Sequence, residues 1–468
     1  MPLALFGTQI LPPPVALLLT VAFVVFLFRR DFRERPNVTN ALWIPLLWML
    51  IIGSRSVVQW LNAFGIMKLG SAEEGNPLDA LVFFSLILAG VGVLNQRRVS
   101  LDAIFRNNGW VIAFLLFCFI AIFWSDYPFV AFKRWIKVLG HPVMVLILFT
   151  EPDPEQAIAT LMKRSAYVLV PFSICFIKYY ESIGRTFDEW GVVANTGVAQ
   201  SKNSLGCGCL VFGLFFFWQF LKTWRSPRSI SRRNELRLLG GLLVMIAYLL
   251  RKSHDATAML CLLIAIAVIL GLGRRWVNKK LIGTYVLLAI IALLAAQLTF
   301  GIFQRVVDLT GHNTTIAGRM ELWHDLLALH TNPVFGVGFE SFWLGDRMTK
   351  LWETRIWHPN EAHNGYLEIY LDLGVLGLCM LACLIVATFR KIRLELFRNP
   401  PWGRFRLGFL AAIVFYNVTE ATFKGLSLPW FVFYLIAMEY PVAEYEPLAQ
   451  SSEAGRLEEE PELTYLPR

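Results

Sequence analysis

Ala80-Leu-Val-Phe-Phe-Ser-Leu-Ile-Leu-Ala-Gly-Val-Gly-Val-Leu94 is an apolar run without a charged side chain. With its flanks it forms a stretch, near residues 78–94, long enough for a helix to span a hydrocarbon layer of about 30 Å. Twelve similar stretches lie near residues 10–28, 41–53, 110–124, 135–150, 158–180, 203–221, 237–250, 257–273, 281–303, 366–389, 406–422 and 425–440. The sequence therefore predicts an all-α, polytopic membrane helix bundle of thirteen transmembrane helices, or twelve if a short stretch does not cross.

The overall composition supports this class of protein. The 468 residues are 56% hydrophobic and only 16% charged, which is too apolar for a soluble protein of ordinary surface area. The first apolar run lacks a basic segment before it and is followed by Arg29-Arg30, so we expect a retained helix rather than a cleaved signal. The seven cysteines lie in apolar runs, where we expect small buried side chains rather than disulfides or metal ligands.

The net charge of +9 is distributed as a membrane topology signal. Basic clusters occur at Arg29–Arg35, Arg97–Arg106, Lys222–Arg237, Arg274–Lys280 and Arg390–Arg406, and each follows an odd-numbered stretch. All five clusters therefore fall on one side, which the positive-inside rule assigns to the cytoplasm. This topology excludes a nucleic-acid footprint, and it places the N-terminus outside and the acidic tail inside.

The same pattern divides the chain into four parts. We expect ten transmembrane helices in 1–303, a periplasmic loop in 304–365, the remaining transmembrane helices in 366–440 and a disordered acidic cytoplasmic tail in 441–468. A loop of about sixty residues is often functional. Apolar positions at helical spacing in 318–327 predict a helix lying against the membrane, ended by Asn332-Pro333, and Gly336-Val-Gly-Phe339 predicts a turn.

Several cationic residues fall on the predicted outer side of the membrane, where the positive-inside rule expects few Lys and Arg residues. Many such side chains are simply solvated or extend to lipid phosphates. As a group they could line one cavity for an anionic, phosphate-bearing substrate. The group consists of Arg55, Lys133, Arg134, Lys202, Arg251, Lys252 and Arg319.

The segment from Glu361 to Glu368 places a histidine and two carboxylates at the membrane surface, where such groups are costly. His363 either packs at the start of the following helix or acts as a general base, for which its ordinary pKa near 6.5 is suited. The pattern around it is not a zinc motif, so we expect no metal. Glu368 and Asp372 share a helix face. Glu420 and Lys424 have the i, i+4 spacing of an ion pair.

Three segments together resemble the O-antigen ligase and polymerase superfamily. They are Arg319-Met-Glu-Leu-Trp323, Asn332-Pro-Val-Phe-Gly-Val-Gly-Phe339, and Ala362-His-Asn-Gly-Tyr366 through Leu373-Gly-Val-Leu-Gly377. Shorter elements look most like the exopolysaccharide-polymerase branch. They are Gly53-Ser-Arg-Ser56, Glu74–Asp79, Trp124-Ser-Asp126, Ser201–Gly206 and Asn417-Val-Thr-Glu420. The chain has Lys252-Ser-His-Asp-Ala-Thr257 where ligases of the family commonly show a Ser-Arg-Gly-like element, which weakens the ligase alternative.

The resemblance implies a glycosyltransferase of the GT-C type in the bacterial inner membrane, acting on the periplasmic side on undecaprenyl-diphosphate-linked glycans. His363 takes the catalytic position and Arg319 meets the donor diphosphate, with Lys202, Arg251, Lys252, Arg55 and Arg134 as further candidates for diphosphate binding. Asn364, Glu361, Glu368 and Asp372 are candidates for orienting the imidazole or the acceptor.

The expected reaction polymerises repeat units with inversion and needs no metal or cofactor. Besides membrane lipids, other polysaccharide-assembly and chain-length proteins are candidate partners. Two alternatives remain. One is a ligase that transfers the glycan to lipid A-core, and the other is a flippase or transporter of lipid-linked glycans, which would bind its substrate near the bilayer midplane.

Overall fold

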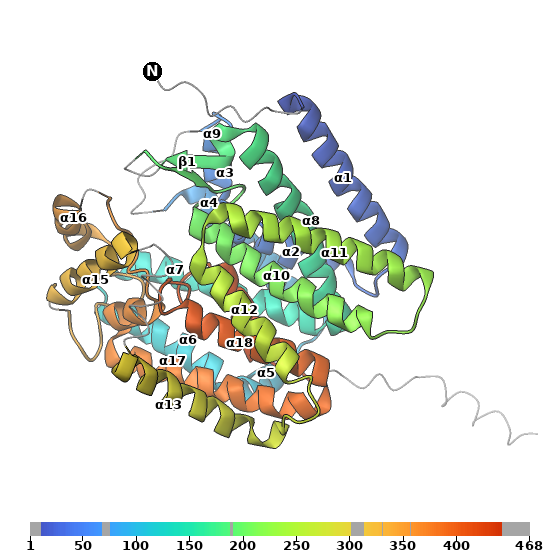
Figure 1. Ribbon diagram of the computed structural model, residues 1–468. Helices are drawn as coiled ribbons and strands as arrows, with labels where there is room; N and C mark the ends of the chain where they lie inside the picture. The colour runs from blue at the N-terminus through green and yellow to red at the C-terminus, as the bar shows by residue number, and fades with distance from the viewer. Residues whose placement is uncertain are drawn as a thin grey trace, which may run out of the picture.

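The structure is a computed structural model that describes residues 11–67, 75–187, 191–300, 313–329, 331–355 and 357–441. It confirms the all-α class, since helices form the body of the molecule (Figure 1). The described residues contain one small antiparallel sheet, in which β1 (Arg185–Phe187) pairs with β2 (Val193–Asn195). The acidic tail beyond residue 441 and residues 304–312 of the expected loop lie outside the described residues.

Each of the thirteen apolar stretches coincides with a helix. These helices are α1 (Pro13–Glu34), α2 (Trp43–Ile52), α4 (Pro77–Gln96), α6 (Gly109–Ile120), α7 (Pro128–Phe149), α8 (Pro154–Tyr179), α10 (Lys202–Trp224), α11 (Ile230–Ser253), α12 (Ala256–Gly271), α13 (Ile282–Phe300), α17 (Gly365–Arg398), α18 (Pro400–Tyr416) and α19 (Leu428–Ala437). Shorter elements connect them: α3 (Val57–Ala63), α5 (Leu101–Asn107), α9 (Glu181–Gly184) and the 3₁₀ turns η1 (Asn40–Leu42), η2 (Ala121–Trp124) and η3 (Lys279–Leu281).

Not every helix is long enough to cross a bilayer by itself. Within the described residues, α4, α8, α10 and α17 satisfy both length and hydropathy, and six spans result if two bent pairs each count as one. The bent pairs are η1–α2 with α3, at 57°, and α5 with α6–η2, at 95°. The chain is thus a multi-pass helical bundle, and the count of twelve or thirteen crossings stays a prediction for its shorter and bent helices.

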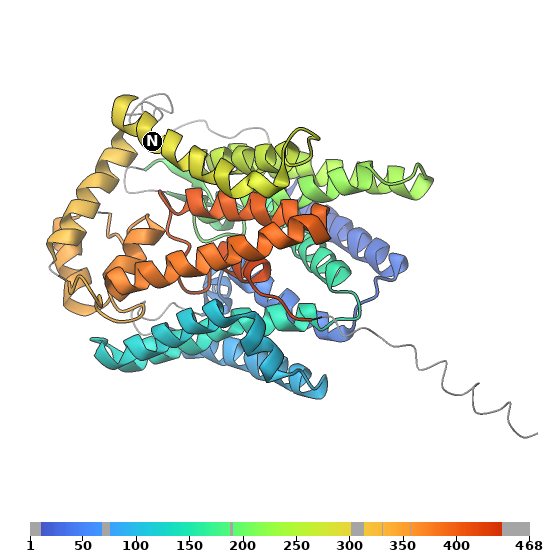
Figure 2. The same ribbon diagram turned by 90° about the horizontal axis from the view of Figure 1, so that it is seen from below.

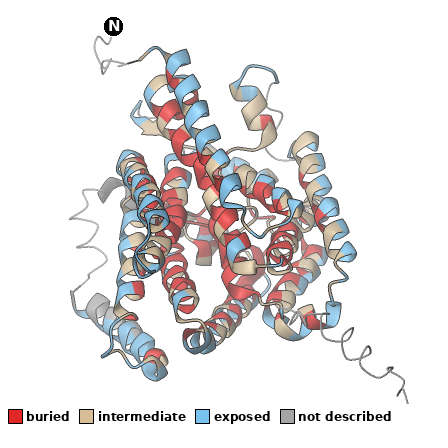
Figure 3. Ribbon diagram, turned by 90° about the vertical axis from the view of Figure 1, so that its right-hand side faces the viewer, coloured by how far each residue is buried: buried red, intermediate tan, exposed pale blue. Residues whose placement is uncertain are grey.

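Apolar side chains are found both inside the bundle and on its outer surface. Buried residues concentrate between the helices, while the outward faces of the peripheral helices are exposed (Figure 3). Those outward faces are nevertheless apolar, as Leu18 and Phe26 on α1 and Leu81 on α4 show. Five cysteines are buried as expected, whereas Cys379 is exposed on α17. Exposed apolar faces of this extent are typical of a lipid-facing surface.

Residues of the basic clusters lie at one end of the bundle. Arg30, at the end of α1, pairs with Glu235 near the start of α11 at 2.5 Å, and Lys222, at the end of α10, pairs with Glu155 at the start of α8. At the same end, Lys391 Nζ donates to the carbonyl of Ala437 at 2.8 Å. This grouping agrees with the prediction that the clusters share one side of the membrane.

The opposite end carries a small cap made of α15 (Asn313–Ala328), α16 (Gly345–Thr354) and their connections (Figure 2). The helix expected at 318–327 is therefore confirmed as part of α15, and the turn expected at 336–339 is also present. Leu322 and Leu326, one helical turn apart, are fully buried in a separate apolar cluster with Phe342 and Ala362. The cap thus has its own core, which holds the chain before α17 in place.

A break in α17 fixes the cap to the bundle. Gly374 has φ 65°, and a Cβ there would approach the carbonyl carbon of Val334 to 2.2 Å, so no larger residue fits. Val337 N donates to Leu371 O at 3.1 Å and Val375 N donates to Pro333 O at 2.9 Å. Two of the segments that carry the family resemblance therefore join each other through backbone hydrogen bonds.

Candidate active site

His363 lies in the tight connection that leads from the cap into α17. Its φ of 49° is unusual for a residue with a side chain, and strained backbone of this kind often occurs at functional sites. The preceding Ala362 is buried, its N–H donates to Glu368 Oε1 at 2.6 Å and its carbonyl accepts from Trp323 Nε1 at 2.7 Å. These two bonds hold the peptide before His363 between α15 and α17.

The start of α17 is pressed against the turn that follows α18. Gly365 N lies within hydrogen-bond distance of the carbonyls of Asn417, at 2.9 Å, and Glu420, at 3.0 Å. A Cβ on Gly365 would come to 2.0 Å from Asn417 Oδ1, so the approach requires glycine. This contact brings the side chains of Glu420 and Lys424 next to His363.

The result is a row of alternating charges. Glu420 accepts from Arg319 Nη2 at 2.8 Å, and its other oxygen lies 3.6 Å from His363 Nδ1. His363 Nδ1 lies 2.9 Å from Glu361 Oε1, and Glu361 Oε2 lies 2.9 Å from Lys424 Nζ. Lys424 also lies 3.5 Å from Glu368. We call these six residues, Arg319, Glu420, His363, Glu361, Lys424 and Glu368, the charge row.

The two carboxylates change the protonation of His363. Burial would lower the pKa of the imidazole, but the two carboxylates, Glu361 at 2.9 Å and Glu420 at 3.6 Å, outweigh burial and raise that pKa to about 9. Burial raises the pKa of Glu361, yet Lys424 and His363 hold it below its usual range. The expectation of an ordinary pKa near 6.5 for His363 is therefore wrong, because that value ignores both carboxylates.

The sequence-based interpretation of Glu420 and Lys424 also needs correction. The apolar stretch at 406–422 does not remain helical to its end, because α18 stops at Tyr416 and both residues lie in the following loop. Their ion pairs in the described structure are with Arg319 and His363, and with Glu361 and Glu368, respectively. The i, i+4 spacing gave no signal of these long-range partners.

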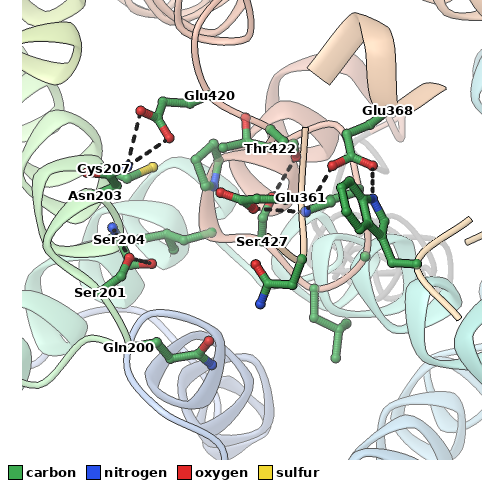
Figure 4. A pocket seen from close by; sticks show the side chains of 18 of the residues that line it. Gln200, Ser201, Asn203, Ser204, Cys207, Glu361, Glu368, Glu420, Thr422 and Ser427 are labelled. Atoms are coloured by element: carbon green, nitrogen blue, oxygen red, sulfur yellow. Dashed lines mark hydrogen bonds and ion pairs between the residues drawn. The ribbon is translucent and has the colours of Figure 1, made fainter. Parts of the chain in front are cut away.

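The charge row borders a cavity of about 690 Å³ (Figure 4). Its polar lining comes from segments far apart in the chain and includes Arg134, Gln200, Ser201, Asn203, Glu340, His358, Glu361, Glu368, Asp372, Glu420 and Lys424. Asn203 Nδ2 points to Glu420 and donates to its carboxylate at 3.2 Å. We call this cavity the main pocket. Glu361 and Glu420 line the main pocket, whereas their partners His363 and Arg319 adjoin it through these two carboxylates.

Arg134 is brought to the main pocket as predicted. Its Nη1 donates to the carbonyl of Glu340 at 2.5 Å. Glu340, which sequence reasoning missed, is half-buried there, and burial raises the pKa of its carboxyl despite the nearby cations Arg134 and Lys424. Its position in the Gly-rich turn, rather than in a recognisable motif, explains why no pattern identified it.

The other predicted cations do not line the main pocket. Arg55 donates to the carbonyls of Ala199, at 3.0 Å, and Ile183, at 2.6 Å, so its guanidinium fixes a neighbouring loop. Lys202, Arg251 and Lys252 are exposed at helix ends. Lys133 lies over the ring of Phe129 at 4.8 Å. The structure therefore does not gather all seven cations into one cavity.

Two of the predicted orienting residues have structural contacts. Asn364 is the N-cap of α17, and its Oδ1 accepts from the N–H groups of Tyr366 and Leu367. Asp372 accepts from the N–H groups of Ser341 and Phe342, which holds the loop above α17. Glu368 does share a helix face with Asp372, since both line the main pocket, and it accepts from Trp343 Nε1 at 2.8 Å.

Within the described part of the chain, Glu361, His363 and Glu420 also form a group that could hold a metal ion, because one ligand atom from each lies within 4.8 Å of the others. The neighbouring charges make this arrangement a poor cation site. Arg319 and Lys424 already pair with the two carboxylates, and a divalent ion would have to displace or repel them.

Residues 240–382 match the family model described as O-antigen ligase, and this segment contains Arg319, His363 and the break in α17. Exopolysaccharide production protein ExoQ of Rhizobium meliloti (strain 1021) is 26% identical over 337 residues, covering 68% of this chain and 72% of that protein. A protein named "Putative polysaccharide ligase RP358" from Rickettsia prowazekii (strain Madrid E) is 24% identical over 270 residues, covering 50% of this chain and 66% of that protein. The resemblance predicted from the sequence is thereby confirmed: residues 240–382 are similar to O-antigen ligases, and the chain is similar to proteins named for exopolysaccharide production and polysaccharide ligation.

Proposed function

We propose that this protein is a glycosyltransferase that polymerises undecaprenyl-diphosphate-linked repeat units at the outer face of a bacterial inner membrane. The observation that carries the proposal is the charge row, which places a histidine and an arginine on opposite sides of one carboxylate at the edge of a large pocket. Four of its six residues lie in the segment 240–382 that matches the O-antigen ligase model, and the other two, Glu420 and Lys424, follow that segment. The charge row lies at the end of the bundle opposite the basic clusters. That position supports a periplasmic site.

His363 is the proposed base. Its Nδ1 faces Glu361 and Glu420, which leaves Nε2 as the nitrogen that takes the proton from the acceptor hydroxyl. The hydroxyl oxygen attacks the anomeric carbon of the donor glycan, and the bond from that carbon to the diphosphate oxygen breaks with inversion. Because its raised pKa keeps His363 protonated at neutral pH, the resting imidazolium first releases its Nε2 proton to solvent.

Arg319 is proposed to stabilise the leaving diphosphate. Its two terminal nitrogens now donate to Thr419 O, at 2.6 Å, and to Glu420, at 2.8 Å. The proposal requires the diphosphate to take over one of these bonds, which a guanidinium can do without losing its charge. Arg319 and Lys424 supply fixed positive charge beside the reaction, so no metal or cofactor is invoked.

The main pocket suits the glycan better than the diphosphate. Its lining contains the carboxyl groups of Glu340, Glu361, Glu368, Asp372 and Glu420 but only two side chains with a permanent positive charge, Arg134 and Lys424. Carboxylates accept hydrogen bonds from sugar hydroxyls and repel phosphate oxygens. The sugar is therefore proposed to occupy the main pocket, with the diphosphate on the side of Arg319.

A ligase is the second candidate within the same chemistry. The similarity to a protein named for exopolysaccharide production, which extends over 68% of this chain, supports the polymerase. The family description and the name of the Rickettsia protein support a ligase. The two differ only in the acceptor, which is a second lipid-linked unit for the polymerase and lipid A-core for the ligase. Chain-length and other assembly proteins are proposed partners in either case.

Reconstitution in liposomes with a radiolabelled undecaprenyl-diphosphate repeat unit tests the proposal. New glycosidic bonds are expected from the wild type, and replacement of the base in His363→Ala is expected to slow their formation about 10²–10⁴-fold. His324→Ala is the matched control, because that histidine is 86% exposed on α15. Unchanged units that reach the opposite leaflet, without new bonds, would instead identify a flippase. Normal polymer from His363→Ala would refute the base assignment.

A further inference from the structure

A second cavity of about 530 Å³ opens at the cap end of the molecule. It is formed where the end of η2 meets the segment between α15 and α16. We call it the side cavity, and its lining consists of Trp124, Asp126, Leu329, Thr331, Asn332, Phe335, Gly336, Val337 and Arg347. It therefore brings together Trp124-Ser-Asp126 and Asn332-Pro-Val-Phe-Gly336, two motifs that the proposed chemistry at His363 does not use.

Ser125 fixes the first of these motifs. Its side chain is buried and lies 2.6 Å from Ser341 Oγ, so residue 125 points into the protein and its two neighbours border the cavity. Trp124 Nε1 donates to the carbonyl of Phe335 at 3.1 Å, and the two rings meet edge to face with centroids 5.5 Å apart. The side cavity consequently has a rigid aromatic wall.

Arg347, from α16, supplies an unsatisfied donor. One terminal nitrogen pairs with Asp126, but Nη1 is buried and has no hydrogen-bond partner in the described structure. A buried guanidinium nitrogen without a hydrogen-bond partner costs free energy, so we expect a bound molecule to supply the acceptor for Arg347 Nη1. Because Asp126 balances the charge of Arg347, the cavity is suited to an uncharged oxygen more than to a free phosphate.

The side cavity and the main pocket share a wall. Gly336 and Val337 line the side cavity, whereas Glu340, four residues after Gly336, lines the main pocket. Asp372 holds this wall, since its carbonyl accepts from Gly338 N at 2.9 Å and its side chain accepts from Ser341 N at 3.2 Å. The two cavities are therefore separated by one short loop, residues 336–340.

We propose that the side cavity is a saccharide subsite that holds a sugar of the glycan chain one or more residues away from the reacting unit. Trp124 and Phe335 contact the apolar face of a pyranose ring, Arg347 Nη1 donates to a ring or hydroxyl oxygen, and Asp126 accepts from a hydroxyl. The proposal rests on the proposed function. It adds a site that retains the growing chain between additions.

The test uses purified full-length protein in nanodiscs and oligosaccharides released by partial hydrolysis of the polymer that the host cell secretes. Binding is measured by saturation-transfer NMR for wild type, Arg347→Gln and Phe335→Leu. The matched controls are Lys350→Gln, an exposed residue of the same helix α16, and Phe129→Leu, which is 72% exposed outside the cavity. Polymer length is measured for the same variants in a strain that lacks the chromosomal gene.

The two cavity variants are expected to bind the oligosaccharides about tenfold more weakly and to make shorter chains, while both controls behave as wild type. His363→Ala is expected to bind the oligosaccharides normally and to make no polymer. Wild-type affinity and chain length in both cavity variants would overturn the subsite, as would binding of inorganic phosphate alone. Normal polymer from His363→Ala would instead refute the proposed function, whatever the side cavity binds.

Discussion

Replacement of Glu361 by glutamine should shift the pH dependence of the reaction. Glu361 and Glu420 together hold the pKa of His363 at about 9 against an ordinary value of 6.5. A difference of about 2.5 pH units corresponds to about 3 kcal/mol in favour of the imidazolium. This is the net effect, and the two carboxylates contribute more than this because they also offset the destabilisation of the imidazolium by burial. Glu361 is the nearer carboxylate, at 2.9 Å from Nδ1 against 3.6 Å for Glu420, so it accounts for the larger share.

The sign follows from the charges that remain. A neutral glutamine no longer stabilises the imidazolium, and Lys424 loses the carboxylate that lies 2.9 Å from its Nζ, so its charge acts more strongly on His363. Both effects lower the pKa of His363, by roughly 1–2 pH units. At pH 7 the fraction of neutral imidazole would rise from about 1% to roughly 10–50%. Activity should therefore begin to rise at a lower pH in Glu361→Gln than in the wild type.

The measurement is kcat/KM for the labelled lipid-linked unit between pH 5.5 and about 9.5, because that parameter reports the free enzyme. Glu353→Gln, an exposed carboxylate of α16, serves as the control and should leave the profile unchanged. An acidic limb at the same pH in Glu361→Gln and wild type would refute the assignment of His363 as the titrating base, whatever the change in maximal rate.

Three further predictions concern other parts of the site. Arg319→Ala should weaken use of the diphosphate donor by roughly ten- to a hundredfold. It should also move the acidic limb of the pH profile to higher pH, because the charge of Glu420 is then no longer shared between Arg319 and His363. Profiles of kcat/KM against pH measure both effects. Gly374→Ala should lower the free energy of unfolding by about 3 kcal/mol or more, because of its φ of 65° and its contact with Val334, whereas Gly92→Ala, with open space around it, should have little effect in thermal unfolding of the solubilised protein. A chelator such as EDTA should leave the initial rate unchanged, and restoration of a lost rate by added Mg²⁺ would contradict the metal-free mechanism.

The sequence was sufficient for the helices and for part of the site. Runs such as 80–94 permit only a helix in an apolar layer, because every backbone N–H and C=O must be bonded within the segment. Helical spacing in 318–327 likewise identified α15 and therefore the neighbourhood of Arg319 and Trp323. These predictions depend on local periodicity, which a single sequence displays directly.

Sequence patterns could not determine which charged side chains become partners. Lys202 and Arg251 carry the same positive charge as Arg319, yet of these three residues only Arg319 reaches Glu420, next to His363. The difference depends on where α15 packs against the turn after α18, about a hundred residues further along the chain. A pattern of charges does not encode such a long-range contact.

The sequence by itself therefore determined a helical membrane bundle, the two ends of that bundle and a histidine at one of them. Only the tertiary structure decided that His363 lies between Glu361 and Glu420. It also decided that Lys424 pairs with Glu361 and that Arg319 pairs with Glu420. A second cavity, on the other side of the 336–340 loop, likewise appears only in the folded chain. The physical reason is that a helix follows from hydrogen bonds a few residues apart. A pKa or a cavity follows from charges and surfaces that meet only when distant segments pack together.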